Sequence, residues 1–136
     1  MIKPIVRDVL FLSLPSEPAA PADTAVGCDL QDTLAAHAHE CVGMAANMIG
    51  IRKRVIIANI GILNLVMYNP VIVKKSGEYQ TEEGCLSLTG KRACTRYRNI
   101  TVEYRDAGWK KHRQDFSGWP AQIVQHEADH LEGIII

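Results

Sequence analysis

The chain has 136 residues, of which 47% are hydrophobic and 22% charged, and its formal net charge is zero. This composition predicts a single globular domain, residues 1–136, that is long enough to bury a core. It provides no basic field for binding nucleic acid, and no apolar run is long enough to cross a membrane. The short apolar run near the N-terminus lacks the length of a secretory signal, so we expect a cytoplasmic protein.

The first third of the chain predicts one helix after an irregular segment. Residues 15–27 are rich in Pro and Ala and are expected to be extended on the surface. Apolar residues then recur at helical spacing and predict a helix over about 30–40, with Asp29 able to cap its start. The apolar positions of this helix are Leu30, Leu34, Ala38 and Cys41.

The middle of the chain predicts strands. Residues 54–60 and 64–73 are rich in β-branched side chains, and Pro70 places a break or a sheet edge in the second segment. Residues 100–106 alternate between apolar and polar side chains, which is typical of a half-buried antiparallel strand, and a turn leads from them into a strand over about 109–116. The apolar face of the alternating strand consists of Ile100, Val102 and Tyr104.

The last predicted element is a helix that is occupied on both sides. Pro120 suits its first turn and Gly133 its end. One side carries an apolar stripe, and roughly the opposite side carries the histidines of the sequence HEADH, residues 126–130, so we expect the helix to lie centrally against a sheet. The three isoleucines at 134–136 predict a short final strand. The apolar stripe consists of Ala121, Val124, Ala128 and Leu131.

The HEADH sequence indicates a metal site. His126 and His130 lie one helical turn apart, so both imidazoles can bind one ion, and Glu127 can reach a water molecule on that ion. The alternative is a pair of helix residues that binds no metal. A catalytic site would need a third ligand and an open fourth position.

Cys85 is the best candidate for the third ligand. It lies in the sequence EEGCLSL, where Gly84 lets the backbone approach closely. In a chain without a secretory signal the cysteines are expected to be reduced, and a thiolate can bind a metal. The remaining candidates have no ligand-like spacing and are expected to be surface or packing residues; they are His37, His39, His112, Cys28, Cys41 and Cys94.

Three motifs, in this order, resemble those of the peptide deformylases. Residues 41–50, CVGMAANMIG, resemble GφGLAAxQ followed by Ile-Gly. Residues 83–87 read EGCLS without a change, and residues 126–130 resemble HExDH. The resemblance covers nearly the whole chain and implies an α+β fold, in which antiparallel sheets pack around a central C-terminal helix that carries HExxH.

The resemblance also implies a reaction, which is removal of the formyl group from the N-terminal formyl-methionine of newly made polypeptides. Cys85, His126 and His130 would hold one divalent metal ion, typically Fe(II), with zinc, nickel or cobalt able to substitute. Glu127 would act as general acid and base. The substrates would be N-formylmethionyl peptides, and the ribosome is a further candidate partner.

The residues that would stabilise the oxyanion include one departure from the family. By resemblance the donors beside the metal are the backbone N–H of Leu86 and the glutamine amide at the position that Met48 occupies here. Methionine has no donor, and loss of one donor costs roughly 10²–10³ in turnover. Asn47 could substitute only if the loop shifted by one residue.

The substrate cleft is expected to include Val42, Gly43, Arg92 and Ile123, although a surface position for Arg92 and core packing for Ile123 are equal alternatives. Two other functions remain open. One is a deformylase-like paralogue with weak or altered N-acyl hydrolase activity, which the methionine at position 48 favours. The other is a non-catalytic binder of formylated N-termini, which the retained Glu127 disfavours.

Overall fold

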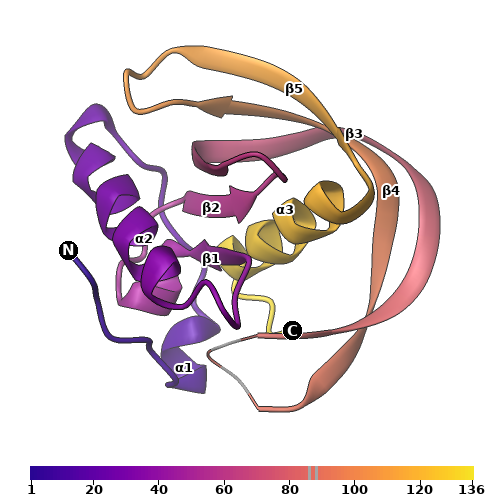
Figure 1. Cartoon of the computed structure of the whole chain (residues 1–136), viewed down its shortest axis with the longest axis horizontal. Helices are drawn as coiled ribbons and strands as arrows, with labels where there is room; N and C mark the ends of the chain where they lie inside the picture. The colour runs from indigo at the N-terminus through magenta and orange to yellow at the C-terminus, as the bar shows by residue number, and fades with distance from the viewer. Residues whose placement is uncertain (86, 88) are drawn as a thin grey trace.

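The computed structural model describes residues 1–85, 87 and 89–136 (Figure 1). Its strands pair antiparallel in the order β1-β2-β3-β4-β5, and helix α3 lies against the concave side of this curved sheet. This confirms the predicted α+β fold around the C-terminal helix. The helices are α1 (Val9–Leu12), α2 (Thr24–Ala36) and α3 (Gly118–Leu131), the 3-10 turns η1 (Pro21–Asp23) and η2 (Ala46–Ile49), and the strands β1 (Gly43–Ala45), β2 (Val55–Asn59), β3 (Asn64–Gly84), β4 (Lys91–Arg105) and β5 (Lys111–Ser117).

The sheet is buried on both faces at β2. Ile56 and Ala58 belong to the apolar cluster that packs on α3, whereas Val55 and Ile57 belong to the cluster that packs on α2. A strand covered on both faces reads as a continuous apolar run, and this explains the sequence at 54–60. The two clusters hold β1 and β2 between α2 and α3, and so fix the position of the β1 backbone.

The predicted helix at 30–40 is displaced in the structure, because α2 begins at Thr24 and ends at Ala36. Asp29 therefore lies inside the helix and does not cap it. Gly27, which lowers the helix propensity of this segment, lies where α2 passes close to Tyr68. The prediction that residues 15–27 are extended is consequently wrong from η1 onward.

The strand predicted at 64–73 continues well past Pro70, to Gly84. The register with β4 shifts between Tyr68 and Val71, and Asn69 has a positive φ of 51°. Such an irregularity accommodates a proline inside a strand. The long β3–β4 hairpin curls around α3 (Figure 1).

The predicted strands near 100–106 and 109–116 are confirmed within β4 and β5, and the three apolar residues of the alternating face are buried. The predicted final strand is wrong, because residues 134–136 form no strand. At Gly133 the backbone turns with a φ of 75° and packs against Ser13. The described residues contain no helix that is long and apolar enough to cross a membrane.

Candidate metal centre and cleft

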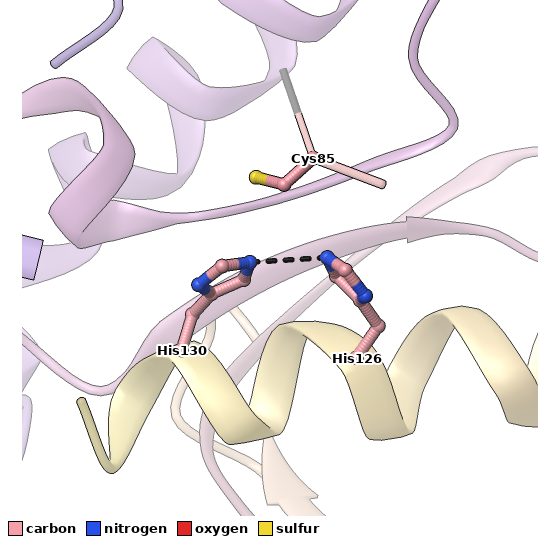
Figure 2. Close-up of side chains that lie close together, drawn as sticks. All are labelled: Cys85, His126 and His130. Carbon is pink, nitrogen blue, oxygen red and sulfur yellow. Dashed lines mark hydrogen bonds between the residues drawn. The ribbon is translucent and has the colours of Figure 1, made fainter. Parts of the chain in front are cut away.

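Helix α3 presents both histidines of HEADH on one side. The His126 and His130 Nε2 atoms face each other at 3.0 Å, and both side chains are buried. Figure 2 shows Cys85, which directly follows the end of β3, above the two rings. The ligand atoms of these three residues all lie within 4.8 Å of one another. The structure therefore brings the three predicted ligands together.

The donor set fits a divalent transition metal. One thiol and two imidazoles are typical ligands of zinc and iron, and three protein ligands leave a fourth position open for water or substrate. Glu127 lies beside this group, and its Oε1 atom is buried without a hydrogen-bond partner among the described residues. A buried carboxylate oxygen without a partner indicates that the site is built to receive a further polar group.

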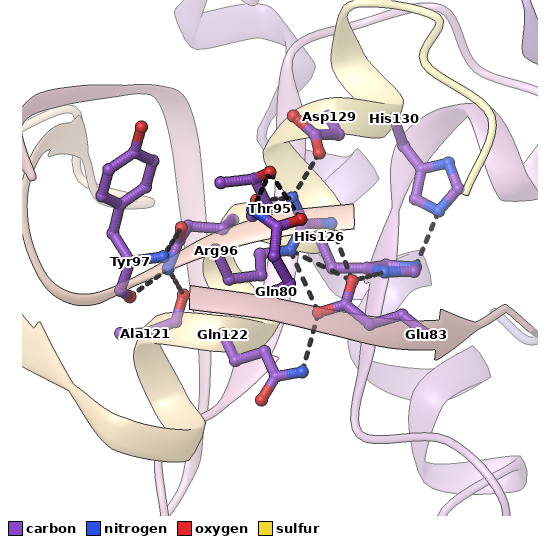
Figure 3. A network of polar contacts seen from close by, with 11 residues as sticks. Gln80, Glu83, Thr95, Arg96, Tyr97, Ala121, Gln122, His126, Asp129 and His130 are labelled. Atoms are coloured by element: carbon purple, nitrogen blue, oxygen red, sulfur yellow. Dashed lines mark hydrogen bonds and ion pairs between the residues drawn. The ribbon is translucent and has the colours of Figure 1, made fainter. Parts of the chain in front are cut away.

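Glu83 fixes the orientation of His126. Its Oε1 lies 2.7 Å from His126 Nδ1, which leaves Nε2 directed at the metal group. Arg96, a residue of β4, donates from Nε and Nη2 to the same carboxylate, and its Nη1 donates to Asp129 on α3 at 2.7 Å. Gln122 Nε2 donates to Glu83 Oε2 at 2.8 Å (Figure 3). Glu83 and Asp129 are therefore joined in one hydrogen-bonding network through Arg96.

The surroundings shift the pKa values of Glu83 and Glu127 in opposite directions. Burial alone would raise the pKa of Glu83, but hydrogen bonds from His126, Arg96 and Gln122 outweigh it and lower this pKa to about 2. Burial raises the pKa of Glu127 to about 7. Glu83 is thus a permanent acceptor near neutral pH, whereas Glu127 can gain and lose a proton there.

The two histidines also differ. Burial opposes protonation of His126, but hydrogen bonds with Cys85 and Glu83 raise its pKa to about 10. Burial and the neighbouring His126 lower the pKa of His130 to about 3. The surroundings therefore act in opposite directions on the pKa values of the two imidazoles.

A cleft of about 280 Å³ opens beside the metal group. Gly43 is required there, because a Cβ atom would lie 2.6 Å from Ile123 Cγ2 and 2.8 Å from Glu127 Oε2. β1 can therefore approach α3 closely only with glycine at this position. The lining includes the predicted cleft residues Val42, Gly43 and Ile123, and also Glu40, Cys41, Glu82, Glu83, Gly84, Lys91, Trp119, Gln122, His126 and Glu127.

Other predicted site residues lie elsewhere. Arg92 is not among the described residues that line the cleft; it donates to Thr89 O at 3.3 Å, and its neighbour Lys91 lines the cleft instead. Met48 is buried in the apolar cluster beneath α2, where its sulfur accepts from the Ala45 N–H. The positions of the Arg92 and Met48 side chains depend on tertiary packing, which the sequence motifs alone do not define.

Asn47 does not replace the missing glutamine amide, since its Nδ2 donates to the backbone oxygen of His130 at 3.0 Å. Leu86, the predicted backbone donor, lies outside the described residues.

Sequence reasoning missed Arg96 and Gln122. Gln122 and Trp119 precede His126 by four and seven residues, so helical spacing could have placed both on the cleft side. No local pattern singles out Arg96, because its partners come from β3 and α3.

Comparisons with known proteins agree with this geometry. The family model described as polypeptide deformylase matches residues 11–136. A peptide deformylase from Clostridium beijerinckii is 54% identical over 136 residues, which is 100% of both chains. The actinonin-bound class I type b peptide deformylase from Acinetobacter baumannii superposes with a TM-score of 0.88 at 31% identity, covering 99% of this chain and 95% of that one. The form of that enzyme bound to Met-Ala-Ser gives a TM-score of 0.88 at 30% identity, covering 99% and 97%.

An antiparallel sheet around an HExxH helix, with a cysteine beside the two histidines, defines a metal-dependent hydrolase. The chain belongs to the polypeptide deformylase family, whose members remove the N-formyl group from newly made polypeptides. The predicted reaction is confirmed at this level, and the two alternative functions are not favoured.

Proposed function

We propose that Cys85, His126 and His130 hold one divalent metal ion, with Fe(II) the expected occupant and zinc, nickel or cobalt able to substitute. The proposal is carried by the close grouping of their ligand atoms within 4.8 Å of one another. When bound, such an ion supplies Lewis acidity that makes water nucleophilic near neutral pH. We also propose that residues 1–136 act as one domain.

Glu127 is the proposed proton carrier. Its carboxylate takes a proton from the attacking water and returns it to the amine nitrogen that leaves with the polypeptide. A pKa near 7 suits both transfers, because the group accepts and releases a proton at similar cost. Glu83 holds His126 through Nδ1 during this cycle.

The substrate side of the proposal is an N-formylmethionyl peptide whose methionine side chain enters the cleft beside Ile123 and Val42. The relative from Acinetobacter baumannii bound to Met-Ala-Ser supports this class of substrate. Leu86 remains the proposed oxyanion donor by resemblance, and Met48 has no group with which to share this role. Since such substrates emerge from the ribosome, we propose a cytoplasmic location and the ribosome as a transient partner.

The test is deformylation of formyl-Met-Ala-Ser by protein prepared without oxygen and loaded with Fe(II) or Ni(II), followed as release of free amine. We expect metal-dependent turnover by the wild type and a fall of about 10²–10⁴-fold in Glu127→Gln, which keeps the side-chain volume but cannot carry the proton. Glu132→Gln is the matched control, because Glu132 follows the same helix and pairs with Arg54 outside the cleft. Equal rates in the two variants, or no turnover in the wild type, would contradict the proposal.

A further inference from the structure

One wall of the cleft carries a polar side chain that reaches the metal group indirectly. Gln122 lies one helical turn before His126 on α3 and is half-buried, and it lines the cleft next to Ile123. Its Nε2 donates to Glu83 Oε2 at 2.8 Å. The other oxygen of the same carboxylate lies 2.7 Å from His126 Nδ1. Gln122 and His126 are thus joined through Glu83 (Figure 3).

The Glu83 carboxylate is held from two directions. Arg96, which is 4% exposed and comes from β4, binds both of its oxygens from the buried side. Gln122 binds Oε2 from the cleft side, so this oxygen accepts from both Arg96 and Gln122. Without the Gln122 amide, Oε2 would keep only the Arg96 Nε contact among the described hydrogen bonds, so the carboxylate would be held less firmly.

We propose that Gln122 is a positioning residue for His126: its amide N–H adds a restraint on the Glu83 carboxylate and, through it, on the orientation of the imidazole in the proposed metal centre. The inference rests on the metal site and hydrolase function proposed above. Partners behind a metal-binding histidine fix the ring and its protonation state, and their loss weakens metal binding or activity.

Gln125 provides a matched control on the same helix. It is buried, and its amide bonds to the backbone of Tyr97 and to Ala121 O, so it has no contact with Glu83. A change at Gln125 therefore disturbs α3 without touching the link to His126. A purely structural role for Gln122 would make the two positions behave alike.

The experiment compares the wild type with Gln122→Leu, Gln122→Met and Gln125→Leu, each loaded with Co(II). The measurements are the Co(II) absorption spectrum, the rate at which a chelator removes the metal, thermal unfolding, and kcat and KM on formyl-Met-Ala-Ser. Gln122→Met nearly retains the side-chain length and adds no charge but has no N–H, so it separates the donor from packing.

Both Gln122 variants are expected to show an altered Co(II) spectrum. A chelator should remove their metal about 10-fold faster or more, and their kcat should fall by a similar factor. KM should change little in Gln122→Leu, because leucine extends the apolar wall beside Ile123. Gln125→Leu should unfold at a lower temperature but keep the wild-type spectrum, metal release and kcat.

A wild-type spectrum and wild-type metal release in both Gln122 variants would overturn the inference. So would an equal change of spectrum in Gln125→Leu, since this would indicate a general loosening of α3. A wild type that binds Co(II) but does not turn over would contradict the proposed function instead, and the spectra and release rates would still decide the role of Gln122.

Discussion

Met48 occupies the position at which the deformylase motif has glutamine, and the structure gives it a packing role. Its side chain is 1% exposed within the apolar cluster beneath α2, and its sulfur lies 3.5 Å from the Ala45 nitrogen. The oxygen of an amide placed there could accept from the Ala45 N–H, but the NH₂ group would lose its water among the apolar side chains of the cluster. Met48→Gln should therefore lower the free energy of unfolding by about 1–3 kcal/mol, measured by chemical denaturation, with no gain in turnover.

Met48→Leu is the control for this substitution, because it nearly conserves volume and should cost less than about 1.5 kcal/mol. A gain of about 10²–10³ in turnover by Met48→Gln without loss of stability would contradict the prediction. That result would mean that the glutamine side chain leaves the cluster and donates into the cleft.

At the scale of elements, the best predicted segments were those whose burial is simple. β2 reads as a continuous apolar run because both of its faces are covered, and residues 100–104 alternate because one face of β4 is buried. The distal part of β3 carries mostly exposed polar side chains, so no period in the sequence marks it as a strand. It is a strand because β4 pairs with it, and pairing between distant segments leaves little local trace.

α2 was misplaced for a comparable reason. Gly27 weakens the local helix signal, yet a Cβ atom at this position would lie 2.0 Å from Tyr68 Oη and 2.9 Å from Val66 Cγ1. Tyr68 in turn donates to the backbone oxygen of Thr24 at 2.7 Å. Gly27 therefore lowers the helix propensity of α2 but allows the helix to approach the sheet closely.

Gly27→Ala tests this close approach. Within an ordinary helix the change would stabilise the protein by about 1 kcal/mol, but here we expect destabilisation of about 1–3 kcal/mol because the methyl group overpacks the contact with Tyr68. Equilibrium unfolding in urea would measure it. Cys28→Ala, at an exposed position of the same helix, should stay within about 0.5 kcal/mol. A Gly27→Ala protein as stable as the wild type would show that α2 can move away without cost.

At the scale of the whole molecule, motifs predicted the centre of the site better than its surroundings. Two short motifs identified Cys85 and the two histidines, and the fold brings their ligand atoms within 4.8 Å of one another. Arg96 could not be found in this way, since it contacts Glu83 on β3 and Asp129 on α3 only after the hairpin has curled around the helix. Motifs thus indicate the candidate catalytic groups, whereas the supporting network depends on the complete fold.

The proposed metal centre also joins parts of the chain that are distant in sequence, so its occupancy should affect the stability of the whole fold. Cys85 follows β3, and the two histidines belong to α3. A ligand that binds only the folded chain at 100 times its Kd stabilises it by about 2.7 kcal/mol. For a domain of this size, removal of the metal should then lower Tm by roughly 10 °C. Calorimetry before and after chelation, with metal content measured in parallel, would test this.

Cys85→Ser is expected to unfold near the temperature of the chelated wild type and to respond weakly to added metal, because the serine hydroxyl is a much poorer ligand than a thiolate. His112→Ala should retain the full response, since His112 pairs with Asp106 on the far hairpin. If chelation removed the metal from the wild type without lowering its Tm, the metal would bind the folded chain weakly or the unfolded chain equally well. Either explanation would contradict the prediction.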